Sequence, residues 1–181
     1  GDRVILSWLN NNNKDVKGSF IYNKKKINYG PVTTFANYSL ISENRLYKIP
    51  KSMDLETAAL YGCAIPTGMG VVINEAKPKK IDVCLVAGLG GVGMFSLIAL
   101  KSIGIKNIIG LDINKQKIKL LKSAGFKNLI NVNSKNYLKK INKMTNNKMI
   151  DYIFDCTGSS KSIEKNFDLL GKNGKLFFCS H

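Results

Sequence analysis

Arginine, histidine and cysteine are all scarce in this sequence, and each scarcity narrows what the protein can be. Only two of the 28 basic residues are arginines, Arg3 and Arg45, and the other 26 are lysines. Arginine is the preferred residue for bidentate contacts to phosphates and bases. We therefore interpret the formal net charge of +16 as lysine on solvated surfaces, and expect no nucleic-acid partner.

The four cysteines and the lack of long apolar runs restrict the class of protein further. None of the cysteines forms a C-x-x-C pair, and three lie in or beside apolar runs, which predicts reduced, mostly buried thiols rather than a disulfide framework. The longest apolar stretch, residues 92–100, is too short to span a bilayer. No secretory signal pattern opens the sequence. These absences favour a cytoplasmic protein without a membrane partner.

The first third of the chain has a weak strand pattern followed by a helical one. Short strands are expected at residues 4–9, 35–41 and 46–49. The polar stretch between the first two, residues 10–26, predicts an exposed loop. Asp54 or Ser52 can cap a first short helix, and a second helix is predicted over residues 67–76.

From Ile81 onward, strands and helices alternate. Strands are predicted at residues 83–87, 107–111, 127–132, 150–155 and 175–179. The first of these is a continuous apolar run, as expected of a strand that is buried on both faces. Helices are predicted over residues 91–103, 114–124 and 137–144, and a fourth carries the stripe Ile163, Phe167 and Leu170. This order predicts an α/β fold with a doubly wound parallel sheet.

A glycine-rich motif links the first of these strands to its helix. Gly88-Leu89-Gly90-Gly91-Val92-Gly93 has the pattern G-x-G-x-x-G, which is informative only in this strand-to-helix context. The first glycine makes a tight turn, the second lets the backbone approach a pyrophosphate, and the third lets helix and strand pack closely. The helix N-terminus then presents N–H groups to the anion. The motif predicts a dinucleotide-binding loop.

An acidic residue follows the next strand at the spacing that a dinucleotide site requires. Asp112 lies nineteen residues after Gly93, where a carboxylate accepts hydrogen bonds from the ribose of NAD and repels the 2′-phosphate of NADP. Capping of the next helix is its alternative role, for which Asn114 is better placed. Lys117, in the first turn of that helix, either contacts the adenosine ribose or is a solvated lysine.

Together these motifs resemble one family over essentially the whole chain. The chain resembles the medium-chain dehydrogenase/reductase superfamily, in its zinc-dependent alcohol dehydrogenase branch. The similar segments are Gly1-Asp2-Arg3-Val4, Phe35-Ala36-Asn37-Tyr38, the segment from Gly62-Cys63 to Gly68-Met69-Gly70, the glycine motif, and Asp112-Ile113-Asn114-Lys115. The resemblance implies a Rossmann domain for NAD, residues 61–181, preceded by part of a GroES-like β domain and a linking helix, residues 1–60.

The resemblance also assigns roles to individual residues. Cys63 corresponds to a catalytic-zinc ligand, and Thr67 and Val92 to residues that line the nicotinamide. Cofactor contacts are implied along the glycine loop, at Gly88, Leu89, Gly90, Gly91, Val92 and Gly93, and at the next strand, at Asp112, Ile113 and Lys117. Further contacts are implied at the ends of the last two strands, at Cys156, Thr157, Cys179, Ser180 and His181.

Departures from the family pattern limit what the chain is expected to do alone. The family's other two catalytic zinc ligands, a Cys and a His, have no counterpart here, and residues 8–35 contain no cysteine for a structural zinc site. The resemblance therefore implies that this chain is a portion of a longer dehydrogenase and lacks the N-terminal ligand region and the C-terminal end. We expect this chain alone to be inactive with NAD and zinc, because a catalytic zinc needs about three protein ligands.

The resemblance implies that the intact protein is a homo-oligomer that transfers a hydride between a primary alcohol or aldehyde and NAD at a catalytic zinc. Two alternatives remain open at this stage. One is a zinc-free quinone oxidoreductase of the same superfamily, against which Cys63 and Asp112 count. The other is a noncatalytic module that binds NAD or nucleic acid.

Overall fold

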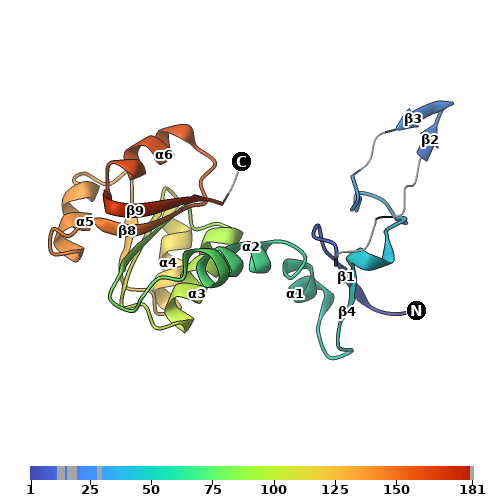
Figure 1. The fold of residues 1–181 in the computed structure, drawn as a ribbon, viewed down its shortest axis with the longest axis horizontal. Helices are drawn as coiled ribbons and strands as arrows, with labels where there is room; N and C mark the ends of the chain where they lie inside the picture. The colour runs from blue at the N-terminus through green and yellow to red at the C-terminus, as the bar shows by residue number, and fades with distance from the viewer. Residues whose placement is uncertain (12–14, 16–19, 28–29, 180–181) are drawn as a thin grey trace. The chain divides into compact units, whose positions relative to one another are not determined.

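The computed structural model describes residues 1–11, 15, 20–27 and 30–179. Within them the chain forms two compact units, Gly1–Cys63 and Ala64–His181. The first unit is a small set of short strands and helices, and the second is built around a sheet (Figure 1). None of the helices in the described part of the chain is long and apolar enough to cross a membrane.

The second unit contains a five-stranded parallel sheet, which confirms the predicted doubly wound α/β fold. The strands lie in the order β7-β6-β5-β8-β9. Their bounds are β5 Val83–Ala87, β6 Asn107–Asp112, β7 Leu129–Asn131, β8 Ile150–Asp155 and β9 Leu170–Phe178. The first strand of the series is thus central, and the chain winds outward from it to both edges. In such a sheet, ligands bind where the strand order reverses, beyond the carboxyl ends of the strands.

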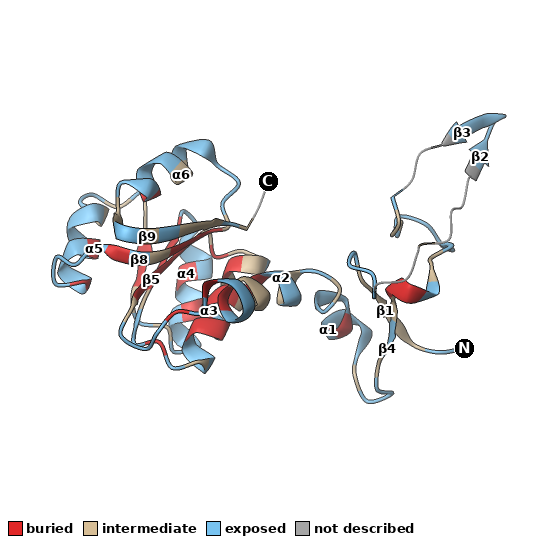
Figure 2. Ribbon diagram, viewed as in Figure 1, coloured by how far each residue is buried: buried red, intermediate tan, exposed pale blue. Residues whose placement is uncertain are grey.

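Helices cover both faces of this sheet. They are α2 Ala64–Gly70 with its π-helical continuation η2 Val71–Ala76, α3 Gly91–Ser102, α4 Lys115–Ser123, α5 Tyr137–Met144 and α6 Ser160–Phe167. One buried cluster joins the sheet to η2, α3 and α4, and a second joins the opposite face to α5. β5 is buried along its whole length (Figure 2), because Cys84 and Val86 enter the first cluster while Val83, Leu85 and Ala87 enter the second. The continuous apolar run of this strand follows from that double burial.

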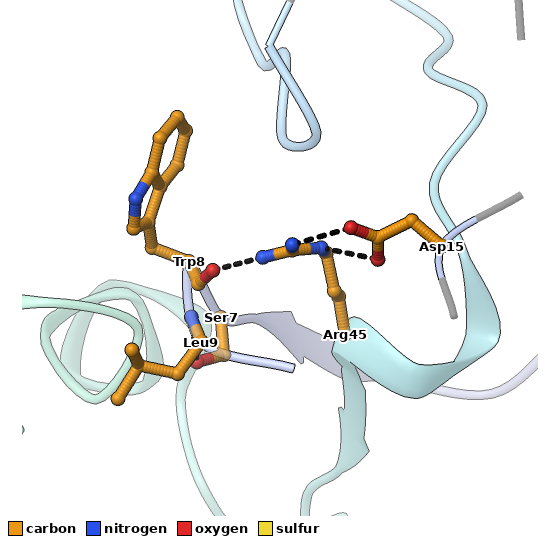
Figure 3. Close-up of polar contacts among 5 residues, drawn as sticks. All are labelled: Ser7, Trp8, Leu9, Asp15 and Arg45. Atoms are coloured by element: carbon orange, nitrogen blue, oxygen red, sulfur yellow. Dashed lines mark hydrogen bonds and ion pairs between the residues drawn. The ribbon is translucent and has the colours of Figure 1, made fainter. Parts of the chain in front are cut away.

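Two arginines connect segments of the first unit that are far apart in the sequence. It consists of β1 Val4–Leu6, β2 Phe20–Tyr22, β3 Lys25–Ile27, the 3-10 turn η1 Glu43–Arg45, β4 Leu46–Lys48 and α1 Leu55–Leu60. Arg3 donates to the carbonyl oxygens of Lys51 and Met53, both at 2.6 Å. Arg45 is 6% exposed; it forms a bidentate pair with Asp15 at 2.6 and 2.8 Å and donates to the carbonyl of Trp8 (Figure 3). The guanidinium of Arg45 lowers the pKa of Asp15. Arg3 therefore holds two backbone carbonyls of this unit, and Arg45 combines a backbone contact with an ion pair.

Two predictions for the first unit are wrong. Residues 35–41 form no strand, and Phe35 and Tyr38 are almost fully exposed; an apolar run becomes a strand only when a partner edge is present to pair with it. The predicted loop at residues 10–26 instead contains the antiparallel hairpin β2–β3. Its turn residues Asn23 and Lys24 have φ of 48° and 62°, as in the two-residue turns that favour asparagine.

The predicted burial of α6 is also wrong. Phe167 is 65% exposed, and Leu170 belongs to β9 rather than to the helix. The buried residue of this helix is Asn166, at 4% exposure, because its side-chain amide donates to the buried carboxylate of Asp155 at 2.9 Å. A polar contact therefore orients α6, where the apolar pattern predicted a hydrophobic one.

The contact between β5 and α3 depends on Gly93. A Cβ atom at this position would lie 1.9 Å from the carbonyl oxygen of Gly88, and neither backbone group can move without separating the strand from the helix. A Cβ on Gly91, two residues earlier, would make only an ordinary 3.6 Å contact with Ala64. The two glycines of one helix thus differ in what they tolerate.

We predict that Gly93→Ala lowers the free energy of unfolding by at least about 3 kcal/mol, because the added carbon overpacks a backbone contact. The same substitution at Gly91 should leave stability unchanged or raise it by up to ~1 kcal/mol, since alanine is the better helix former. Urea unfolding followed by circular dichroism measures both. Equal stability of the two variants would contradict the close packing of β5 on α3.

Candidate functional site

The turn between β5 and α3 has the geometry of a phosphate-binding loop. Gly88 has φ of +83°, and a Cβ there would lie 2.7 Å from the carbonyl oxygen of Cys156, so only glycine suits this position. Gly90 differs from it, because nothing lies within 4 Å of the position its Cβ would take. The open side of the loop is therefore at Gly90, directly before the first turn of α3, where N–H groups lack intrahelical partners.

Asp112 fixes the loop to the end of the neighbouring strand. Its side chain is buried at 8% exposure; one carboxylate oxygen accepts from the Leu89 N–H at 2.7 Å and the other from the Asn114 N–H at 2.7 Å. Asn114 itself caps α4 by accepting from the N–H groups of Gln116 and Lys117. Asp112 therefore does not act as the helix cap, and its charge is held at the carboxyl end of β6.

A second buried carboxylate, that of Asp155, holds the chain by hydrogen bonds at the end of β8. Asp155 is 1% exposed and accepts from the N–H and hydroxyl of Thr157 at 3.0 and 2.6 Å. Its other oxygen accepts from Asn166 at 2.9 Å and from the Ser162 hydroxyl at 3.3 Å. These contacts hold both the turn after β8 and the inner side of α6.

A cavity of about 470 Å³ lies at this carboxyl edge. It brings together seven of the predicted site residues: Gly88, Gly90, Asp112, Ile113, Lys117, Cys156 and Thr157. Because these residues end or follow the adjacent strands β6, β5 and β8, the cavity lies beyond the carboxyl ends of the strands where the strand order reverses.

Other predicted residues lie apart from the cavity lining. Leu89 is buried beneath the loop at 3% exposure, and Gly91, Val92 and Gly93 form the first turn of α3. Thr67 is an exposed residue of α2, and Cys179 directly follows β9. Ser180 and His181 lie outside the described residues. Of the loop residues, Gly90 therefore faces open space, whereas Leu89 and Gly93 pack inside the fold.

Sequence reasoning missed the contribution of α6. Lys161, Ser162, Lys165 and Asn166 of this helix line the cavity, together with Ser159 before it. Their spacing of three and four residues places them on one helix face. The sequence therefore contained a polar stripe that could have indicated this side of the cavity. The prediction instead placed the buried face of the helix by its apolar residues Ile163 and Phe167, which lie on the other side. Lysines 161 and 165, with Lys117 of α4, give the cavity three cationic side chains.

The expected zinc ligand, Cys63, belongs to no cluster of metal donors among the described residues. Cys63 is an exposed free thiol at the end of the first unit. Over residues 1–11, 15, 20–27 and 30–179, no group of three or more His, Cys, Asp and Glu side chains gathers as a metal site. The donor set in the described part of the chain therefore does not fit a catalytic zinc, which requires about three protein ligands.

Comparison with known proteins places this geometry among dehydrogenases. The sequence profile of the zinc-binding dehydrogenase family matches residues 91–181, just over half of the chain. A benzyl alcohol dehydrogenase from Acinetobacter calcoaceticus is 30% identical, with a TM-score of 0.69 over 75% of this chain and 37% of that protein. An alcohol dehydrogenase zinc-binding domain protein from Burkholderia ambifaria is also 30% identical, with a TM-score of 0.68 over 75% of this chain and 36% of that protein.

The same fold occurs in a protein described by a different reaction. The CurK enoyl reductase is 21% identical, with a TM-score of 0.65 over 75% of this chain and 40% of that protein, so it shares the fold alone. The chain therefore spans about 36–40% of the length of these three proteins.

We predict that Asp155→Ala lowers the free energy of unfolding by about 1–3 kcal/mol, because it leaves the buried Asn166 amide and the Thr157 N–H without their acceptor. Asp168→Ala, at the exposed C-terminal end of α6, is the matched control and should change stability by less than about 0.5 kcal/mol. Urea titration of both variants provides the measurement. Indistinguishable midpoints would show that the Asp155 contacts do not hold α6.

Proposed function

The chain belongs to the zinc-binding dehydrogenase family, and from that premise we propose that it carries the NAD site of an alcohol dehydrogenase. In this proposal the intact protein transfers a hydride between a primary alcohol or aldehyde and NAD. The observation that carries it is the open backbone at Gly90, which faces free space at the start of α3 beside the fixed carboxylate of Asp112. The 30% identity to a benzyl alcohol dehydrogenase supports an alcohol as the substrate class.

In the proposed complex, the N-terminus of α3 holds the pyrophosphate of the cofactor. Free N–H groups and the helix dipole favour an anion there, and Gly90 lets it approach the backbone. The three lysines that line the cavity, Lys117, Lys161 and Lys165, add attraction for a negatively charged ligand. Asp112 has unused lone pairs on both carboxylate oxygens and can accept from ribose hydroxyls.

The bound cofactor would supply the hydride acceptor, and the chain would orient it. Thr157 and Cys156 lie at the cavity wall and would border the cofactor riboses, while Thr67, Val92, Cys179, Ser180 and His181 remain proposed contacts of the nicotinamide side. Asp155 acts as a positioning residue, because it holds the Thr157 turn through two hydrogen bonds.

The first unit is proposed to be part of a GroES-like catalytic domain, with Cys63 as one donor to a metal. Since the described residues offer no further donors to complete that site, no reaction step is assigned to zinc.

The proposal is tested by NADH binding to Gly90→Val. The valine side chain has room in the folded protein but would occupy the space of the pyrophosphate, so we expect the dissociation constant to rise at least about 100-fold, ~2.8 kcal/mol. Fluorescence titration with NADH measures it, and unfolding experiments should show an unchanged fold. Gly1→Val is the matched control, because a Cβ there also meets nothing within 4 Å but lies outside the proposed site, and it should bind NADH as the parent chain does. NADH affinity that is unaffected by Gly90→Val would refute the assignment of the loop.

A second prediction concerns the choice between NAD and NADP. The carboxylate of Asp112 would repel a 2′-phosphate, so NADPH should bind at least about tenfold more weakly than NADH, ~1.4 kcal/mol. Asp112→Ser should narrow that ratio toward one by improving NADPH binding, whereas Asp168→Ser, which removes the same charge elsewhere, should leave it unchanged. Equal affinities of the parent chain for both cofactors would contradict this role of Asp112.

A further inference from the structure

Two cysteines occupy adjacent positions at the carboxyl edge of the sheet. β8 and β9 are parallel neighbours in which Asp155 lies opposite Phe178, and the Cys179 N–H donates to the Asp155 carbonyl at 2.8 Å. One step further along both strands, Cys156 therefore lies opposite Cys179. Adjacent strands are separated by about 4.8 Å, which is within the Cα separation of roughly 4.4–6.8 Å that a disulfide needs.

Both side chains point to the same side of the sheet and remain accessible. They pack against the same buried cluster, the one that contains Cys84 and Leu97, and each is half-buried rather than enclosed. Cys156 also forms part of the cavity wall. A small oxidant in that cavity therefore reaches Cys156, and Cys179, although it does not line the cavity, is itself only half-buried and so open to a small oxidant.

The two thiols influence each other's reactivity. A hydrogen bond from the Cys156 thiol to the Cys179 sulfur lowers the pKa of Cys179, and the same hydrogen bond, with burial, raises the pKa of Cys156. In its neutral form the Cys179 thiol lies 3.7 Å from the Phe177 carbonyl oxygen, to which it donates. Cys179 is thus the stronger candidate for the thiolate that attacks first, with Cys156 held beside it.

The other cysteines lack this arrangement. Cys84 is fully buried, and burial raises the pKa of its thiol to about 12, which makes it inert. Cys63 is exposed and lies in the other compact unit. These two residues provide internal references for a protected thiol and a freely reactive one.

We propose that Cys156 and Cys179 form an oxidant-sensitive pair that closes into an intrachain disulfide in the presence of a hydroperoxide. The Cys179 thiolate attacks the peroxide oxygen, which yields a sulfenic acid and releases hydroxide or alkoxide. The Cys156 sulfur then attacks the sulfenic sulfur, and the sulfenic hydroxyl leaves and takes the Cys156 proton to form water. Two thiols are oxidised, one peroxide is reduced, and a covalent bridge joins β8 to β9 beside the cavity.

The test uses the folded chain with Cys63→Ser, which removes intermolecular cross-links, and hydrogen peroxide as the probe. After oxidation, the protein is denatured, its remaining thiols are alkylated, and non-reduced peptides are mapped by mass spectrometry. We expect Cys156 and Cys179 to be lost together as one linked peptide pair, Cys84 to remain alkylated, and dithiothreitol to restore both thiols. This readout does not depend on cofactor binding, so it stands or fails separately from the proposed function.

Single substitutions separate the two roles. Cys156→Ser should form no disulfide and should accumulate a sulfenic acid at Cys179 that a 1,3-dione traps. Cys179→Ser should react at least about tenfold more slowly with peroxide, because the remaining thiol is a poor nucleophile. The proposal is overturned if both thiols survive a peroxide dose that oxidises Cys63 in the parent chain. It is equally overturned if Cys84 becomes linked as readily as Cys156.

Discussion

Direct contact between backbone atoms at the glycine turn is the constraint on which the site depends. Gly88 packs against the Cys156 peptide of the neighbouring strand, and Gly93 packs against Gly88 itself. A side chain at either position would separate β5 from β8 or from α3. Because the three elements are this close, the first turn of α3 opens at the carboxyl edge between two strand ends, where the cavity lies. The third position of the motif, Gly90, is the one that the fold leaves open.

Two buried carboxylates extend this constraint to the loops around the cavity. Asp112 and Asp155 each end a strand. Both oxygens of each carboxylate accept hydrogen bonds from the following turn or from a neighbouring element. A buried charge is costly unless it is fully hydrogen-bonded, so these contacts hold the loops in one arrangement. The same residues that shape the cavity therefore restrict how far its walls can move.

An element can be predicted from sequence when the residues that determine it lie close together in the sequence. β5 and α3 were predictable because burial on both faces leaves a continuous apolar run and because the glycine spacing is specific. The hairpin β2–β3 was not, since its signal is only a tolerated positive φ at Asn23 and Lys24. The buried face of α6 was also missed, because Asn166 is selected by Asp155, eleven residues away, and apolar periodicity does not detect a polar anchor.

The charge of the cavity illustrates the same limit. With 26 lysines in the chain, composition predicts a diffuse positive surface in which no single lysine is informative. The fold nevertheless places Lys117, Lys161 and Lys165 around one cavity, while the carboxylates at its edge are engaged in internal hydrogen bonds. The walls therefore combine three exposed lysines with a carboxylate at Asp112 that its hydrogen bonds hold in place. In the proposed function, the lysines attract an anionic ligand, while the carboxylate of Asp112 accepts from its hydroxyl groups and repels a second phosphate.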